Sequence, residues 1–377
     1  MSDAPRSNRR DFLRGAAGRR ALDEATESVD SGESAAVQHP YLLTLGHDAM
    51  ACRFQVYLNC GQYPQGVDSA LAGLELLEPL EEQLTVYRDT SEIVEINQRA
   101  CDEPVPVESR LFELLVKARE LFEATDGAFD VTAGPLVKVW GFYRRQGRIP
   151  EEGDLATARE RVGMQHVQLD LSEQTISLSQ RGMELNLGSI GKGYALDRCG
   201  EVMSDAGVND FLWHGGQSSV LARGDSFELA AKSAEGESAV GWSIGVMDPL
   251  QPQRRLGEVR LHNQALATSG ASVQFFRYRG KRYGHILDPR SGWPAEGVFS
   301  ATAIAPTAAE ADALSTAFYV LGPKRATDYC EAHPGIGAVI VAPTASGSGV
   351  EVFTAGLRPG QWRLAATNET GPSADLA

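Results

Sequence analysis

The sequence predicts an α+β fold. Segments with helical spacing of apolar residues and segments with alternating apolar and polar residues both occur, but they do not follow a regular strand–helix–strand rhythm. The chain has 377 residues, of which 42% are hydrophobic and 23% charged, which is typical of a soluble globular protein with a proper core.

Spacing and cap residues place the helices. Leu71, Leu74 and Leu77 share one face of a segment over 67–84, and Ser91 is a suitable N-cap for the helix that follows. The segment that Ser109 begins is strongly amphipathic and should stop near Gly127. Further helices are expected over 151–163, from near Tyr194 to Gly207, and from 308 to the break at Gly322 and Pro323.

Alternating residues place the strands. The segment 47–61 alternates and reads as one strand, and 336–343 is apolar enough for a buried one. Segment 166–188 reads as strand, turn, strand and strand. Other strands are expected over 208–224, around a glycine turn, and within 241–280.

The two ends differ from the rest of the chain. Residues 1–40 are expected to form a disordered arm, in which "SNRRDFLRGAAG" resembles a twin-arginine export signal. Charged residues follow instead of an apolar run, so we expect a cytoplasmic protein, with export through a twin-arginine signal as the alternative. Residues 41–363 are expected to form one domain and 364–377 a flexible tail.

Charge and cysteine content argue against several classes of protein. The net charge of −15 opposes binding to nucleic acid, and no apolar run is long enough for a transmembrane segment. The five cysteines are scattered and odd in number, which argues against a disulfide framework or a structural zinc site.

The segment "MELNLGSIGKGYALDR", 183–198, is the first candidate site. A strand, a glycine loop and the start of a helix together form an anion cradle, because the first N–H groups of a helix are free. Gly188 leaves the loop bare and Lys192 adds a positive charge. The alternative is a tight turn that simply requires glycine.

Asp312 and Thr316 form the second candidate. They stand four residues apart on one helix face, among apolar neighbours. A carboxylate with a hydroxyl suits Mg²⁺, which takes its other ligands from phosphate and water. The alternative is a carboxylate that interacts with the helix dipole and a threonine bonded to its own helix.

The third candidate is "GKRYGHILDPRSGWPAEG", 280–297. Proline and glycine make a rigid turn that holds His285, Asp288 and Arg290 close together. The alternative is a basic surface hairpin with solvated side chains. The aromatic residues Phe129 and Trp140 could stack on a flat ring system or pack in the core.

Taken together, the chain resembles the FAD:protein FMN transferase family (ApbE-like proteins). The matching blocks cover roughly 45–345 and are "AMACRFQVYL", "LTVYRDTSEIVEIN", "TDGAFDVTAGPLVKVWGF", "LNLGSIGKGYALDR", "HGGQSSV", "ATSG", "KRYGHILDPRSG" and "ADALSTAFYVLG". The resemblance implies an ApbE-like, T-fold-like α+β architecture with largely antiparallel sheets and a flavin site in a central cleft.

It also implies a function: Mg²⁺-dependent transfer of FMN from FAD to a threonine or serine hydroxyl of an acceptor protein, with release of AMP. By resemblance, Asp312, Thr316 and the backbone carbonyl near Ser189 hold the metal, and Lys192 holds the pyrophosphate. His285 is the base, supported by Asp288. The remaining flavin-nucleotide positions implied are Met50, Tyr87, Ala128, Phe129, Asp130, Asn186, Gly188, Ile286 and Arg290.

The chain departs from the family pattern at two positions. Asn186 and Gln217 stand where relatives often have aspartate, so the site keeps hydrogen-bonding capacity but loses negative charge. Two alternatives therefore remain: an Mg²⁺-dependent FAD pyrophosphatase that yields FMN and AMP, and a catalytically weakened flavin-binding protein.

Overall fold

The computed structural model describes residues 41–232, 240–271, 274–346 and 349–365. The arm over 1–40, with its arginine pair, and residues 366–377 lie outside the described residues.

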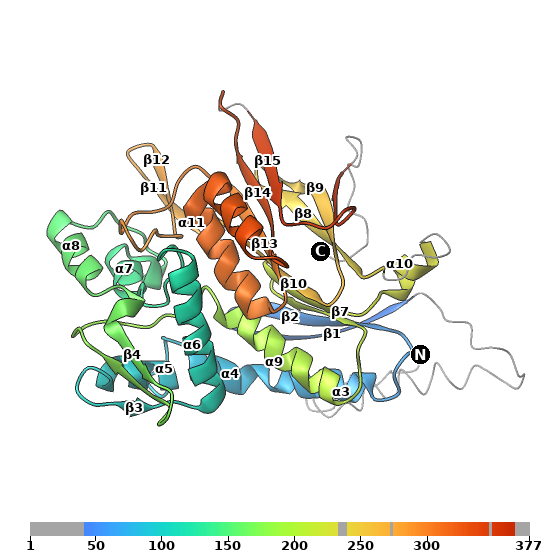
Figure 1. The fold of residues 1–377 in the computed structure, drawn as a ribbon, viewed down its shortest axis with the longest axis horizontal. Helices are drawn as coiled ribbons and strands as arrows, with labels where there is room; N and C mark the ends of the chain where they lie inside the picture. Colours follow the sequence, from blue (N-terminus) through green and yellow to red (C-terminus); the bar gives the residue numbers. More distant parts are fainter. Residues whose placement is uncertain (1–40, 233–239, 272–273, 347–348, 366–377) are drawn as a thin grey trace, which may run out of the picture. The chain divides into compact units, whose positions relative to one another are not determined.

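An antiparallel sheet of eight strands forms the centre of the domain (Figure 1). Its order is β1-β2-β6-β7-β10-β13-β14-β15. In that order the strands are Leu42–Ala49, Cys52–Asn59, Phe211–Gly215, Ser219–Arg223, Gln264–Gly270, Ser300–Ala305, Gly337–Pro343 and Val350–Ala355. Consecutive members pair antiparallel, which confirms the expected α+β class with largely antiparallel sheets.

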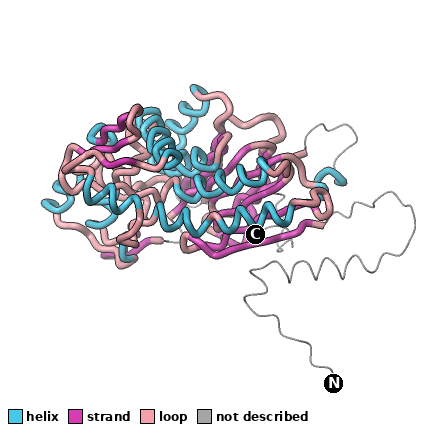
Figure 2. Tube along the Cα trace, turned by 90° about the horizontal axis from the view of Figure 1, so that it is seen from below, coloured by secondary structure: helices cyan, strands magenta, loops and turns pink. Residues whose placement is uncertain are grey.

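Helices cover one face of this sheet, and a second sheet covers the other. Helices α3 (Gly66–Glu75), α9 (Gly191–Asp205) and α11 (Ala308–Ala332) lie on the first face, as Figures 1 and 2 show. The large core lies between them and the sheet. A smaller core lies between the other face and the sheet β16-β9-β8 (Trp362–Leu364, Gln251–Leu261 and Trp242–Asp248).

The segment between β2 and β6 supplies most of the remaining elements. It contributes α4 (Leu77–Leu84), α5 (Glu92–Arg99), α6 (Ser109–Ala124), α7 (Gly134–Val139), η1 (Phe142–Arg144), α8 (Glu152–Glu160) and η2 (Met164–His166). It also contributes a small sheet, β3-β5-β4 (Val105–Pro106, Thr175–Leu178 and Val167–Asp170). Later in the chain come α10 (Phe227–Lys232) and a hairpin of β11 (Phe275–Tyr278) and β12 (Lys281–Gly284).

Several boundaries differ from the sequence-based expectation. The strand expected over 47–61 is a hairpin, because Met50 and Ala51 adopt φ of 50° and 58° and turn the chain. The helix expected over 67–84 is two helices that meet at Leu76. Glu108, rather than Ser109, caps α6 through its side chain. Ser91 caps α5 as expected.

Two further differences concern segments near the candidate site. Residues 183–187 form no strand beyond an isolated bridge at Glu184. Helix α11 is interrupted at Gly322 as expected, where φ is 76° and ψ is 175°, but a second helical stretch follows directly and reaches Ala332. Leu364, expected in the flexible tail, closes β16 against Gly257.

No helix in the described part of the chain is long and apolar enough to cross a membrane.

Candidate functional site

The glycine loop leads directly into helix α9. Helix α9 begins at Gly191, and no side chain caps it at Ile190. The expected start near Tyr194 was therefore too late by one turn, and Lys192 stands in the first turn. The helix dipole and the Lys192 side chain favour an anion near this helix start, while the Gly191 and Gly193 N–H groups are bonded to the Leu187 carbonyl and to Asp312.

The loop before the helix is held by amide side chains. Asn97 binds the backbone of Leu185 in both directions, at 2.7 and 3.0 Å. Asn186 accepts a hydrogen bond from the Gly188 N–H at 2.9 Å. An aspartate could accept this bond equally well, so the loop shape does not require a carboxylate at this position.

Asp312 places a buried carboxylate beside the start of α9. Its side chain is on α11 and only 5% exposed. One oxygen accepts from the Gly193 N–H at 2.7 Å and the other from the Ser219 hydroxyl at 2.6 Å. Both donors are neutral, and among the described residues no lysine, arginine or histidine forms an ion pair with it. A buried anion without a cationic partner is a place where a metal ion fits.

The neighbouring oxygens suit Mg²⁺ rather than a softer metal. Thr316 Oγ1 lies 3.1 Å from Ser269 Oγ and 3.4 Å from the backbone oxygen of Asp312. Ser189 is half-buried in the loop before α9. Within the described residues no three histidine, cysteine, aspartate or glutamate side chains gather around a point. A site here would combine one carboxylate with hydroxyl, carbonyl, phosphate and water oxygens, which is the habit of Mg²⁺.

His285 is oriented by the backbone of Gln274, the residue before β11. Its Nδ1 donates to the Gln274 carbonyl at 3.0 Å, and its backbone N–H donates to the same oxygen at 3.2 Å. Because a carbonyl only accepts, the proton sits on Nδ1 and Nε2 is left as the basic nitrogen. Burial lowers the pKa of His285 below 6.5; the Gln274 bond opposes this, and nearby Lys192 lowers the pKa further. The imidazole is therefore neutral near pH 7.

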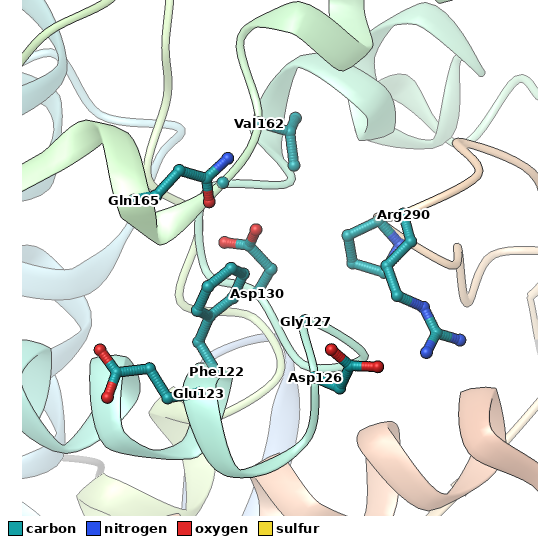
Figure 3. A pocket seen from close by; sticks show the side chains of 10 residues that line it. Phe122, Glu123, Asp126, Gly127, Asp130, Val162, Gln165 and Arg290 are labelled. Carbon is teal, nitrogen blue, oxygen red and sulfur yellow. The ribbon is translucent and has the colours of Figure 1, made fainter.

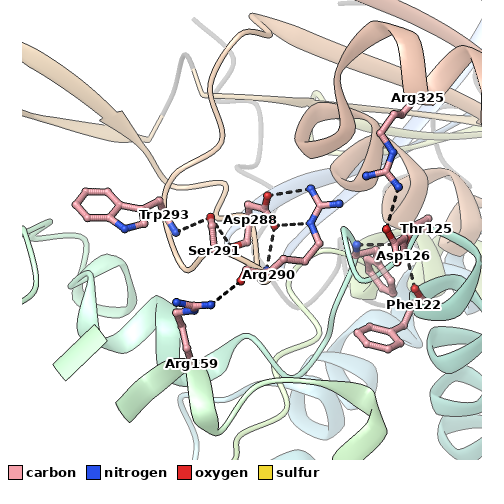
Figure 4. A network of polar contacts seen from close by, with 10 residues as sticks. Phe122, Thr125, Asp126, Arg159, Asp288, Arg290, Ser291, Trp293 and Arg325 are labelled. Carbon is pink, nitrogen blue, oxygen red and sulfur yellow. Dashed lines mark hydrogen bonds and ion pairs between the residues drawn. The ribbon is translucent and has the colours of Figure 1, made fainter. Parts of the chain in front are cut away.

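Asp288 does not perform the orienting role expected for it. Its carboxylate binds Arg290 instead, through Nε at 2.8 Å, Nη2 at 2.9 Å and the backbone N–H at 3.0 Å (Figure 4). Arg159 in turn donates to the Arg290 carbonyl at 3.1 Å. The turn is rigid, as its proline and glycine predicted, but the histidine it follows is held by Gln274.

Arg290 and Asp130 line a pocket of about 270 Å³ (Figure 3). The Asp130 carboxylate points into it between Phe122 and Gln165 in Figure 3. Burial raises the pKa of Asp130 to about 6, although hydrogen bonds from the Thr132 N–H and hydroxyl act in the opposite direction. Ala128 and Phe129, the residues before it, are only 1% exposed.

The aromatic residues divide between core and surface. Phe129, Trp140 and Phe142 are buried, so their role in this structure is core packing. Tyr87, by contrast, is 66% exposed, and its ring lies 4.8 Å from that of Tyr143. The Tyr143 hydroxyl donates to the Val86 carbonyl at 2.9 Å. This pair is a platform on which a flat ring could stack.

Met50 and Ile286 are the remaining residues that were predicted to contact the flavin nucleotide. The Met50 N–H donates to Glu81 at 2.8 Å in the turn between β1 and β2. Ile286 is buried directly after His285. Cys52, at the start of β2, lies within electrostatic range of both Lys192 and Asp312.

The start of α9 contacts one of the other stretches directly, because the Gly193 N–H binds Asp312. The charge of the preceding residue, Lys192, contributes to the lowered pKa of His285. Sequence reasoning missed Gln274 and Ser219, which orient the histidine and the carboxylate. Ser219 lies in the quoted block "HGGQSSV", but no local pattern links it to residue 312.

These parts define a class: an α+β protein with a helix-start anion site, a buried carboxylate and a neutral imidazole, which together suit phosphoryl transfer. The model of the ApbE family matches residues 50–340, and the chain belongs to that family.

Relatives and solved structures agree with this assignment. An FAD:protein FMN transferase of Treponema pallidum is 32% identical, over 78% of this chain and 82% of the relative. One from Klebsiella pneumoniae is also 32% identical, over 73% and 83%. The ApbE protein of Thermotoga maritima superimposes with a TM-score of 0.71 at 29% identity, covering 83% and 97%. The flavin transferase ApbE of Vibrio cholerae gives 0.70 at 26%, covering 84% and 97%.

Proposed function

We propose that this chain is an FAD:protein FMN transferase. It cleaves the pyrophosphate of FAD, attaches FMN to a serine or threonine hydroxyl of an acceptor protein, and releases AMP. The observation that carries the proposal is a neutral imidazole, fixed by Gln274, next to the Lys192 anion cradle. Its family membership and its transferase relatives support the same reaction.

The base acts through the nitrogen that Gln274 leaves available. Nε2 of His285 takes the proton of the acceptor hydroxyl while the oxygen forms its bond to the FMN phosphorus. The bond from that phosphorus to the bridging oxygen breaks, and AMP leaves with the electron pair. The Lys192 ammonium binds the pyrophosphate, and the positive end of the α9 dipole favours its negative charge.

Asp312, Thr316 and the Ser189 carbonyl would hold Mg²⁺. The ion supplies positive charge that reduces repulsion between the diphosphate and the incoming oxygen. Gly193 and Ser219 keep the Asp312 carboxylate aimed at the loop. Only one carboxylate serves this site, because Asn186 and Gln217 are neutral, so we expect Mg²⁺ to bind weakly without FAD.

The flavin nucleotide is bound by the remaining residues. We assign the exposed Tyr87 to ring stacking and the backbones of Met50, Ala128, Phe129, Gly188 and Ile286 to close contacts along FAD. Asp130 and Arg290 line a polar pocket that suits hydrogen bonds to a heterocycle or ribose.

In-gel flavin fluorescence tests the proposal. The protein is incubated with FAD, Mg²⁺ and a serine- or threonine-bearing acceptor, and the acceptor is separated under denaturing conditions. Fluorescence on the acceptor is expected. Free FMN and AMP without labelled acceptor would indicate an FAD pyrophosphatase, and retained, unchanged FAD would indicate a flavin-binding protein.

Two variants test the assigned roles. His285→Ala should bind FAD as the unaltered protein does, yet transfer no FMN; transfer at the normal rate would remove the histidine from the role of base. Asp312→Ala should lose activity at every Mg²⁺ concentration and should lose Mn²⁺ binding measured without FAD. An active variant that still depends on Mg²⁺ would reject this ligand.

A further inference from the structure

The hairpin of β11 and β12 is positively charged, whereas the chain as a whole is negatively charged. Residues 275–284 read FFRYRGKRYG, with four cationic side chains and no acidic one, in a chain whose net charge is −15. Arg277, Arg279, Lys281 and Arg282 are all exposed. In Figure 1 the hairpin projects from the body beside α7 and α11.

One face of the hairpin is anchored. Phe276 and Tyr283 face each other across the two strands and stack at 5.3 Å. Both pack on Trp140, whose ring centre lies 6.3 Å from Phe276 and 5.9 Å from Tyr283. A two-stranded hairpin is marginal alone, and this aromatic contact stabilises it.

Two of the cationic side chains face each other across the hairpin. Arg277 and Arg282 stand directly opposite each other, and like charges in that position are destabilising. Their guanidinium groups lie 6.0 and 4.0 Å from the ring of Phe275, which is itself 41% exposed. Arg279 similarly lies over the exposed Tyr278. Like charges held close together, next to exposed aromatic rings, are typical of a binding surface.

Few acidic groups of the protein neutralise this surface. Glu296 pairs with Lys281 at 2.7 Å. Asp288, the other acidic residue close in sequence, is engaged with Arg290. The positive charge of the three arginines therefore remains available to a partner.

The hairpin begins and ends at the site. Gln274 precedes β11, His285 follows β12, and these two residues are the pair joined by two hydrogen bonds. A four-residue strand spans about 13 Å, so a segment bound along the hairpin can present its neighbouring residues to the imidazole.

We propose that the β11–β12 hairpin is the docking surface for an acidic segment of the flavin-acceptor protein. The proposal rests on the proposed function, because the reaction requires a protein hydroxyl at His285. Four cations on an otherwise acidic protein suit a short acidic segment. An extended polyanion such as a nucleic acid or an anionic membrane would be repelled by the rest of the surface.

Peptide binding tests the surface without requiring transfer. The probe is a short fluorescein-labelled peptide with a central threonine and flanking glutamates, compared with the same peptide carrying glutamines. Fluorescence anisotropy with the full-length protein should show about ten-fold tighter binding of the acidic peptide, since each exposed ion pair contributes about 0.2–1 kcal/mol. The difference should shrink as salt reduces the Debye length from about 30 Å to about 8 Å.

A hairpin without its three arginines supplies the decisive comparison. The combined variant Arg277→Gln, Arg279→Gln and Arg282→Gln, which keeps Lys281 paired with Glu296, should lose the preference for the acidic peptide while its affinity for FAD stays unchanged. The matched control, Arg99→Gln, Arg110→Gln and Arg181→Gln, removes three exposed, ion-paired cations and should keep the preference. Two of these lie on α5 and α6, elements outside the hairpin.

The outcomes separate this proposal from the proposed function. Equal affinity for both peptides, an unaffected hairpin variant, or an equal loss in the control would overturn the docking surface. Binding only to DNA or to anionic lipid vesicles would overturn it too. Acidic-peptide binding that depends on the hairpin, without any FMN on the threonine, would support docking and count against transfer.

Discussion

The contact between α9 and α11 depends on the absence of a side chain at Gly193. A Cβ at this position would lie 2.0 Å from the Ala308 oxygen and 2.6 Å from the Ala309 nitrogen. Both are backbone atoms in the first turn of α11. Gly193→Ala therefore requires the two helices to separate by about 1 Å, since non-bonded heavy atoms rarely approach closer than about 3 Å.

That separation breaks the hydrogen bonds between the helices. The Gly193 N–H would move out of range of Asp312, now 2.7 Å away. One turn further along the same face of α9, Asp197 accepts from the Ala308 and Ala309 N–H groups at 2.8 Å each, and this contact would be strained. Losing a hydrogen bond to a charged group costs about 1.5–3 kcal/mol, and overpacking about 1–3 kcal/mol. The better helix propensity of alanine returns about 1 kcal/mol.

The expected result is a loss of about 2–5 kcal/mol in the free energy of unfolding. Urea unfolding followed by tryptophan fluorescence measures it. FMN transfer should also fall, because Asp312 leaves its position relative to Lys192.

Gly191→Ala is the matched control, two residues away in the same helix turn. Its Cβ would lie 3.7 Å from the nearest neighbouring atom, Leu84 Cδ1, which is ordinary contact. We expect unchanged stability or a gain of up to about 1 kcal/mol. If both variants unfold at the same urea concentration, the close helix approach does not carry the stability that we assign to it.

Three further predictions concern single groups. The value of kcat/KM for transfer should rise with pH to a plateau, with a midpoint below 6.5, because His285 acts as a neutral base with a lowered pKa. Because the charge of Lys192 lowers that pKa, Lys192→Gln should move the midpoint to higher pH. Ser219→Ala removes the hydroxyl that donates to one oxygen of the buried Asp312 at 2.6 Å, and should lower the free energy of unfolding by about 1–3 kcal/mol in chemical denaturation. A change near zero would mean that water replaces the hydroxyl. The pKa of Asp130 is raised from 3.8 to about 6, so its ionisation destabilises the folded protein increasingly as the pH rises between those two values. Asp130→Asn should therefore raise the melting temperature more at pH 8 than at pH 5. An equal rise at both pH values would contradict the raised pKa.

The sequence by itself determined the elements whose signals are local. Periodicity and caps predicted α5, α8 and β14, and the glycine loop with Lys192 predicted an anion cradle before its geometry was known. The helix break at Gly322 was also predicted correctly from its glycine and proline, whereas the roles of His285 and Asp312 stay predictions. These features depend on backbone preferences and side-chain chemistry within a few residues.

Tertiary structure decided everything that depends on contacts between distant segments. Only the fold selects Gln274 as the partner of His285, and Gly193 and Ser219 as the donors to Asp312. Only the fold buries Trp140 and leaves Tyr87 exposed. A hydrogen bond across a hundred residues leaves no periodic pattern in the chain, because its partners are chosen by how the helices and sheet pack, and packing is a property of the whole core.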